Sequence, residues 1–280
     1  MLLAQLKNEL WKLFGKKRTY IGFGAFVLAQ TAMLLMFKYR HGPTFLERIL
    51  AANGYLASEY ISALTVALVM LIPQLALLMP LYVTLVGGDM VAKEVEDGSM
   101  RMILSRPISR VRLLFVKWIA GAIFSAVLVL VLGVVALGFA RLLFPWKGMF
   151  VFAEDPSPVF GLFVASDGLK LYAFSHLFMA VNAVAMFSVA SMFSCFNMKP
   201  AAATILALSY LLMSLVMEHI PFFESYQRWF ITRHMESWVL VFQSPVPWPQ
   251  LLQSQIILLA TSATAFVIGA LAFQVRDIKT

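Results

Sequence analysis

The sequence predicts an all-α integral membrane protein with six transmembrane helices, and two observations lead to this fold class. The first is composition. The chain has 280 residues, of which 61% are hydrophobic and only 13% are charged, and its mean hydropathy is +0.84. Such a composition leaves too few polar residues to cover a water-soluble core. The second is that the apolar residues fall into six separate runs without Asp, Glu, Lys or Arg.

The six runs are each long enough to cross roughly 30 Å of hydrocarbon as a helix. The second run contains Pro73 and Pro80, which predict a kinked or tilted helix. An amphipathic lead-in from Arg112 precedes the third. The predicted spans are residues 20–37, 60–86, 118–140, 171–198, 200–217 and 251–275.

Before the first span, apolar residues recur at helical spacing, and polar residues mostly occupy the other side of the helix. We expect residues 1–18 to form a helix in the plane of the membrane surface, with its lysines near anionic headgroups. The alternative is a solvated leader. No secretory signal peptide is visible, because Glu9 and several lysines interrupt the segment. The apolar residues are Leu3, Leu6, Leu10, Leu13 and Phe14.

The distribution of charge predicts an orientation. The net charge is +8, from 22 Lys and Arg against 14 Asp and Glu. With both termini in the cytoplasm, the inner segments hold most of the basic residues, whereas basic and acidic residues balance in the outer segments. Basic residues are enriched on the cytoplasmic side of membrane proteins. We therefore expect a multi-pass protein of a plasma or bacterial inner membrane with both termini inside.

The connection between the second and third spans, residues 87–111, is the one long charged stretch of the chain. Gly87 and Gly88 are expected to mark the inner end of the second span or a bend there. From Asp89 to Asp97 the helix can continue, and Asp89 can cap it if the helix restarts at that point. Gly98 permits a left-handed turn, and Ser99 is positioned to cap a short helix.

This short helix is predicted to present an apolar face made by Met100, Ile103 and Leu104. Pro107 ends it, and Ser109 is positioned to cap the third span. Glu94 and Glu96 are expected to hold nearby basic residues such as Lys93, Arg101 or Arg106.

In type and order, this connection resembles the cytoplasmic signature of ABC-2 family permeases. That signature has an acidic pair, then Gly-Thr, a Leu-rich half-turn, Pro, Arg, and a Lys that opens the next span. The chain departs from it at two positions, with Ser99 in place of Thr and Arg101 where an acid is common. The matching residues are Glu94, Glu96, Gly98, Ser99, Leu104, Pro107, Ser109, Arg110 and Lys117.

The resemblance implies that this short helix is a coupling helix, which docks on a separate ATP-binding subunit and transmits its motion to the spans. It also places the turn at residues 196–200 beside that subunit, and the C-terminal residues 273–277 resemble the usual ending of the family. The alternative is an ordinary solvated loop. The residues assigned to coupling are Asp89, Glu94, Glu96, Gly98, Ser99, Met100, Arg101, Ile103, Leu104, Pro107, Arg110 and Lys199.

No enzymatic constellation is visible in the sequence. It contains no Gly-x-x-x-x-Gly-Lys phosphate-binding loop, so we expect ATP and Mg²⁺ to be bound by the partner subunit and no cofactor by this chain. The single cysteine, Cys195, excludes an internal disulfide and a cysteine-based metal cluster. We expect a transport subunit, not an enzyme, and no nucleic acid as a partner.

Polar residues inside the spans are few. Gln74 and Asn182 are interpreted mainly as hydrogen-bond formers between helices, and alternatively as lining a translocation path. His176 is interpreted as a helix-contact or interfacial residue. No carboxylate lies securely within a span, which argues against an ion-coupled secondary transporter.

The predicted outer loops are residues 38–59, 141–170 and 218–250, and none is large enough to form a domain. Prolines limit helix length there, and Trp146, Trp229, Trp238 and Trp248 fit interfacial belts on the outer leaflet. We therefore predict one membrane domain, residues 1–280.

The hypothesis that follows is a permease that pairs with a second permease copy, identical or related, and with two ATP-binding subunits to drive export. The sequence leaves the cargo open, although short outer loops and few buried charges favour an amphipathic or lipid-like molecule. The alternatives are a subunit that transmits force to an extracytoplasmic partner or anchors an assembly, and an ion-coupled carrier.

Overall fold

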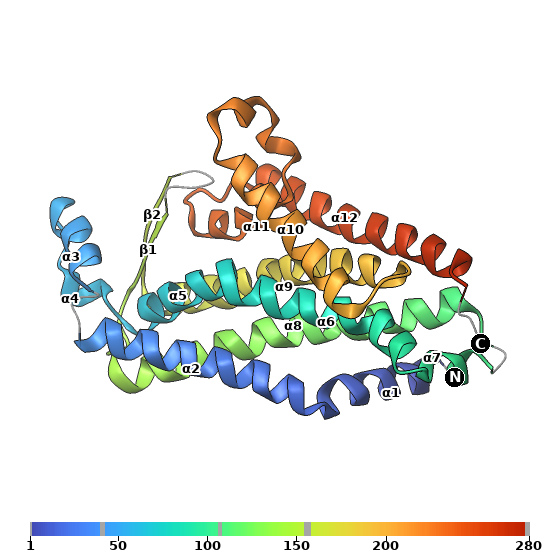
Figure 1. Ribbon diagram of the computed structural model, residues 1–280. Coiled ribbons are helices and arrows are strands. Elements are labelled where there is room, and N and C mark those ends of the chain that lie inside the picture. The colour runs from blue at the N-terminus through green and yellow to red at the C-terminus, as the bar shows by residue number, and fades with distance from the viewer. Residues whose placement is uncertain (1, 40–42, 106–107, 154–157, 278–280) are drawn as a thin grey trace.

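The computed structural model describes residues 2–39, 43–105, 108–153 and 158–277. Six helices are long and apolar enough to cross a membrane, which confirms the predicted fold class. They are α2 (Lys17–Tyr39), the second span Ala63–Glu96, α8 (Arg110–Leu143), α9 (Ala165–Cys195), α10 (Pro200–Glu218) and α12 (Trp248–Val275). Both chain termini lie at one end of the bundle, which we call the terminal end (Figure 1).

Helix α9 is the central element of the bundle. Its span is 61% buried, against 17% for α2 and 28% for both α10 and α12. It packs against the second span, α8, α10 and α12. Small residues on α9 allow this many neighbours to come close. The fully buried small residues are Ser175, Ala183, Ala185, Ala190 and Ser194.

The second span is irregular where the sequence places its prolines. Helix α5 (Ala63–Pro73) is followed by a π-helical segment, η1 (Gln74–Leu78), and then by α6 (Met79–Glu96). The ring of Pro73 removes one backbone donor, and a π-helical turn is one of the known forms that such an irregularity takes. Pro80 lies in the first turn of α6, where a missing N–H costs nothing.

Gly87 and Gly88 lie inside a helix that continues toward Asp97, so the helix does not restart at Asp89. Helix α6 runs through both of them to Glu96, and Asp89 is therefore an interior helical residue, not a cap. The glycines permit close packing. A Cβ atom on Gly87 would lie 2.8 Å from the carbonyl oxygen of Phe187 in α9, and one on Gly88 would lie 2.9 Å from the backbone nitrogen of Thr204 in α10.

The end of the bundle opposite the termini carries a β-hairpin that the sequence did not predict. Strands β1 (Met149–Ala153) and β2 (Val159–Phe163) pair antiparallel, with Met149 opposite Phe163. The backbone N–H of Phe150 donates to Thr65 Oγ1 of α5 at 2.8 Å, which attaches the hairpin to the second span. Two short helices, α3 (Pro43–Ala52) and α4 (Ala57–Tyr60), lie at the same end (Figure 1).

The connection between α10 and α12 folds back onto the bundle. It comprises η2 (Pro221–Trp229), α11 (Ile231–Met235) and η3 (Glu236–Phe242). Residues 237–242 are all buried, because η3 packs against α9, α12 and β2. Trp238 is only 8% exposed, so its assignment to an interfacial belt was wrong, whereas Trp229 is 74% exposed.

The tight contact at Gly88 gives a test of the packing. Gly88→Ala is expected to lower the free energy of unfolding by about 1–3 kcal/mol, because the added methyl meets the backbone of α10. Gly138→Ala in α8 has no atom within 4 Å of the new Cβ and should raise it by up to about 1 kcal/mol, the helix propensity gain. Equilibrium unfolding in mixed micelles measures both, and equal effects would contradict the close approach.

Candidate functional site

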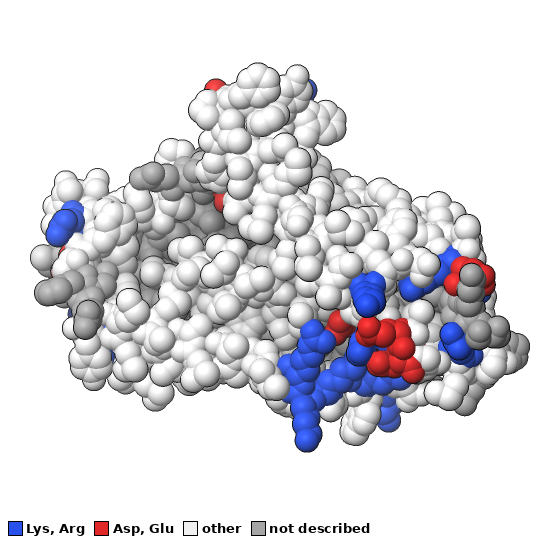
Figure 2. Space-filling model, viewed as in Figure 1, with Lys and Arg blue, Asp and Glu red and all other residues white. Residues whose placement is uncertain are grey.

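Charged side chains gather at the terminal end of the bundle. On the face shown in Figure 2, lysine, arginine and acidic residues form a cluster there, while the flank of the bundle is almost uncharged. The cluster lies over α1 (Leu2–Gly15), the end of α6 and the short helix α7 (Ser99–Leu104). The predicted coupling segment therefore lies where charged side chains gather on this face.

The turn between α6 and α7 has the geometry that the sequence predicts for Gly98. Its φ is +73°, in the left-handed region that favours glycine. Ser99 does not cap α7, so that expectation was wrong; Gly98 occupies the cap position. The Ser99 hydroxyl instead donates to the carbonyl oxygen of Glu94 at 3.2 Å. Ser109 caps α8 as predicted, accepting from the backbone N–H of Arg112.

The apolar face of α7 faces inward. Met100 is fully buried, and Ile103 and Leu104 pack half-buried against the core of the same chain. Met100 is therefore covered by its own chain, whereas Ile103 and Leu104 keep part of their surface exposed. The outward face carries Arg101 and Met102, which is 71% exposed. Pro107 lies outside the described residues.

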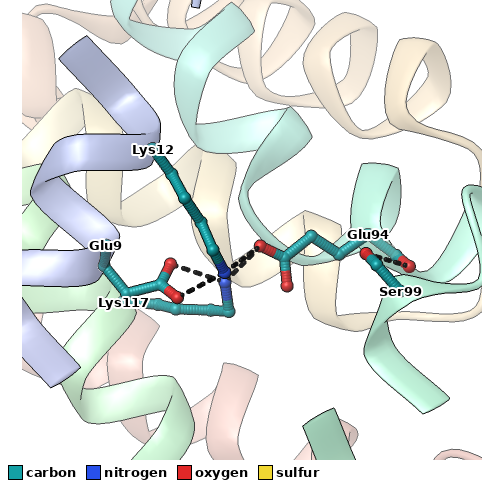
Figure 3. Close-up of polar contacts among 5 residues, drawn as sticks. All are labelled: Glu9, Lys12, Glu94, Ser99 and Lys117. Atoms are coloured by element: carbon teal, nitrogen blue, oxygen red, sulfur yellow. Dashed lines mark hydrogen bonds and ion pairs between the residues drawn. The ribbon is translucent and has the colours of Figure 1, made fainter. Parts of the chain in front are cut away.

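Four charged side chains from three helices form one network beside α7 (Figure 3). The ammonium of Lys117, in α8, lies 2.8 Å from Glu9 Oε2 of α1 and 2.7 Å from Glu94 Oε1 of α6. Lys12 of α1 completes the network, at 2.8 Å from Glu9 Oε1 and 3.4 Å from Glu94 Oε1. The two carboxylates and two ammonium groups balance in charge.

The network is buried at its centre, since the Lys117 side chain is only 1% exposed. A buried ammonium requires opposite charges close by, because its hydration is lost. Burial alone would raise the pKa of Glu9, but Lys117 and Lys12 outweigh that effect and leave the pKa lowered. Burial would lower the pKa of Lys12, but Glu9 and Glu94 leave it raised. Charged forms are therefore favoured on α1.

Two further acidic residues assigned to coupling, Glu96 and Asp89, also form ion pairs. Glu96 Oε2 lies 2.8 Å from the ammonium of Lys93, as expected for the acidic pair, and Asp97 also approaches Lys93 at 3.1 Å. Asp89 forms an ion pair with Arg18, the second residue of α2. Sequence reasoning missed the partners of Glu94, Lys12 and Lys117, because they lie on other helices and Lys12 is 82 positions away along the chain.

Two arginines form hydrogen bonds that link the ends of α8, α9 and α12. Nη1 of Arg110 donates to three carbonyl oxygens at the end of α12, those of Phe273, Gln274 and Arg276, at 2.7–3.1 Å. Nη1 of Arg276 in turn donates to the carbonyl oxygen of Ser194 at 3.2 Å, in the last turn of α9. Cations stabilise the C-terminal ends of helices, where carbonyls lack partners and the dipole is negative. Arg110 thus links α8 to α12.

An open groove of about 620 Å³ lies at the terminal end and joins three segments that are far apart in sequence. They are the end of α6 with the start of α7, the turn after α9, and the end of α12. The first two are segments that the sequence resemblance placed beside a partner, and the third resembles the usual C-terminal ending of the family. Lys199, at the start of α10, is exposed next to this turn. The residues that line the groove are Val95, Arg101, Phe196, Asn197, Ala272, Val275, Arg276 and Asp277.

The two polar residues considered for a translocation path lie in different surroundings. Gln74 accepts from Nε2 of Gln30 at 3.3 Å and donates to the carbonyl oxygen of Met70 at 3.0 Å, so it links α2 with the second span. Asn182 lies on the wall of an apolar cavity. His176 is buried, with Nδ1 2.6 Å from the carbonyl oxygen of Tyr172, and it packs on Gly133 of α8.

Fold and site together define a multi-pass α-helical membrane protein with a charged terminal end. Among the described residues, no group of three or more His, Cys, Asp or Glu side chains is arranged to hold a metal ion. The sequence profile of a family described as "ABC-2 family transporter protein" matches residues 6–227. The chain therefore belongs to the ABC-2 transporter family and is a membrane permease component of ABC-type transport. No curated protein matches it significantly.

The buried ion network is expected to stabilise the terminal end. Lys117→Met removes the ammonium between Glu9 and Glu94 and leaves two buried carboxylates with only Lys12. We expect the free energy of unfolding to fall by about 3–5 kcal/mol, and hydrogen exchange in α1 to increase. Lys170→Met is the matched control, because this lysine pairs with Asp167 at a side chain that is 77% exposed. Equal stability of the two variants would contradict the role of the network.

Proposed function

We propose that this permease component is the membrane subunit of an ATP-driven exporter, and that its terminal end lies in the cytoplasm and docks a separate ATP-binding subunit. The groove that joins α6, α7, the turn after α9 and the end of α12 carries this proposal. Val95 and Phe196 offer apolar surface whose burial would give affinity for the ATP-binding subunit. The charges of Arg101 and Asp277 would fix the position of that subunit in the groove. ABC-2 permeases generally pair with ABC ATP-binding subunits.

The contacts at the terminal end provide a route by which movement of the ATP-binding subunit would reach the spans. A partner seated in the groove presses on α7, which follows the second span through the turn at Gly98. Glu94 passes that movement to α1 and α8 through Lys117. Arg110 passes it to α12. Four of the six spans, the first by way of α1, are therefore linked to one docking surface by ion pairs and hydrogen bonds that resist separation.

The proposed assembly contains two permease chains and two ATP-binding subunits. Of the six spans, α2, α10 and α12 leave most of their apolar surface uncovered in the single chain. A second copy that covers α2 and α10 would leave α12 to the bilayer. ATP and Mg²⁺ would be held by the partner, and this chain would contribute no catalytic group. The expected location is a plasma or bacterial inner membrane.

A second candidate function is transmission of force to an extracytoplasmic protein. It is favoured by η2, which projects from the bundle (Figure 1) and exposes Phe222 at 82%, Trp229 at 74% and Tyr226 at 58%. Aromatic residues are enriched both at protein interfaces and at membrane surfaces. Transport by the permease and ATPase alone in proteoliposomes would exclude this candidate, and a stable outer partner without transport would favour it.

Docking at α7 is tested by Met102→Asp. Because Met102 is exposed and its neighbours Met100 and Leu104 are internal, the variant adds charge to the outer face without disturbing the fold. We expect affinity for the ATP-binding subunit to fall about tenfold, which corresponds to about 1.4 kcal/mol, as measured by co-purification and by ATPase stimulation. Asn8→Asp adds the same charge on the exposed face of α1 and should leave both readouts unchanged. Loss in both variants, or in neither, would contradict docking at α7.

Orientation is tested by thiol labelling. Cys195, the single cysteine, is buried, and Cys195→Ser removes the remaining background. In that chain, Ser105→Cys lies just after α7 and Lys170→Cys near the start of α9, both at exposed positions. A membrane-impermeant maleimide should label the variant at 170 in intact cells and the variant at 105 only after permeabilisation. The reverse pattern would place the terminal end outside and overturn the proposal.

A further inference from the structure

An apolar cavity of about 380 Å³ lies in the half of the bundle away from the termini, between the second span and α10. Its volume is within the range of about 300–1,000 Å³ typical of small-molecule sites. Strand β1 and the segment from α11 to η3 form further walls, and α9 contributes Asn182 and Met186. Figure 2 shows the surface hollowed between the projection formed by α10 and η2 and the rest of the bundle.

The mouth of the cavity opens on the flank of the bundle. Its rim residues are apolar and exposed: Ile72 at 46%, Leu77 at 62%, Leu81 at 45% and Leu212 at 56%. In a chain that spans the bilayer, such a rim is continuous with the surface that contacts lipid tails. The cavity is therefore accessible from the hydrocarbon core, and an apolar molecule can enter it without crossing water.

Asn182 supplies one buried polar atom that has no partner. The side chain is 3% exposed, and Nδ2 donates to the carbonyl oxygen of Met235 at 2.5 Å. Because the carbonyl oxygen of Met235 can only accept a hydrogen bond, the NH₂ group of Asn182 must face it, and Oδ1 of Asn182 must point away from it. Oδ1 of Asn182 has no hydrogen-bond partner among the described residues. An unsatisfied buried acceptor costs about 1–3 kcal/mol, and a bound donor would recover part of this cost.

The other polar groups on the wall also favour a donor. The hydroxyl of Thr232 is already used, since it donates to Glu218 Oε2 at 2.6 Å. Glu236 adds a carboxylate to the wall, and neither Lys nor Arg is among the residues that line the cavity. An anionic headgroup would therefore find no basic side chain on this wall, whereas a hydroxyl or an amine could donate to Asn182 Oδ1.

We propose that this cavity binds an amphiphile with an apolar body and a neutral or cationic hydrogen-bond donor, a hydroxyl or an amine, whose donor bonds to Asn182 Oδ1. The molecule enters sideways from the bilayer and is the class of cargo that the permease moves; this last step rests on the proposed function. Binding itself requires only the single chain.

Photolabelling of the full chain in phosphatidylcholine nanodiscs tests the site. The probe is an octanol that carries a diazirine, and the labelled residues are mapped by mass spectrometry. We expect saturable labelling of wall residues such as Met186, Leu211 and Trp238. Excess 1-octanol or 1-octylamine should compete, whereas octane and octanoate should not. Even labelling along all lipid-facing helices, or equal competition by octane, would overturn the proposal.

Two variants test separately the hydrogen bond to Asn182 and the space inside the cavity. Asn182→Leu should weaken competition by 1-octanol about tenfold. Ala76→Phe, at an exposed position on the cavity wall, should block labelling without changing the buried core. If Asn182→Leu does not fold, Ala76→Phe alone tests whether the probe binds in the cavity. Ala25→Phe is the matched control on an exposed position of α2 outside the cavity. Labelling that neither Asn182→Leu nor Ala76→Phe reduces would overturn the assignment.

The cargo role is separated from the proposed function by a second readout. In the reconstituted complex with the ATP-binding subunit, 1-octylamine should stimulate ATPase activity, and Ala76→Phe should abolish only the stimulated part. Specific labelling without stimulation would overturn the cargo assignment and leave the ATPase partnership standing. A chain that labels specifically but binds no ATP-binding subunit would overturn the proposed function and still support the binding site.

Discussion

The terminal end of this permease depends on one buried ammonium group. Lys117 lies between Glu9 and Glu94, within 2.8 Å of both, and joins α8 to α1 and α6. An unpaired charge at that depth would cost several kcal/mol, so the three helices hold their relative positions as long as the network is intact. The same contacts connect α7 to the bundle, because Glu94 also accepts from Ser99 through its backbone carbonyl. Stability and proposed force transmission thus have one physical origin.

Away from this network, the second span is organised by packing. Glycines 87 and 88 let α6 approach the backbones of α9 and α10, while π-helical η1 separates α5 from α6. Close packing at one end of the second span and irregularity in its middle leave the apolar cavity on the flank. A rigid docking end and a laterally open cavity on the same span give a short route from partner to cargo site, which is the arrangement that the proposed function requires.

Much of the fold followed from the chain alone, and the failures have a common cause. Hydropathy predicted six spans, and Gly98 and Ser109 were assigned correctly because turns and caps depend on local backbone geometry. The apolar face of α7 was identified, but its partner was not: Met100 packs on the same chain. The β-hairpin and the buried position of Trp238 were missed because contacts with other elements set both. The coupling roles assigned to these residues remain predictions.

What the sequence by itself determined is which segments enter the bilayer and which residue types gather between them, since transfer of a segment from water to lipid depends on its own composition. The tertiary structure decided which charges meet. Glu9, Glu94 and Lys117 are far apart along the chain, and only the packing of α1, α6 and α8 brings them within hydrogen-bonding distance. It also decided that Asn182 Oδ1 lies on a cavity wall without a donor, because a pairing between residues is a property of the folded bundle and not of any one helix.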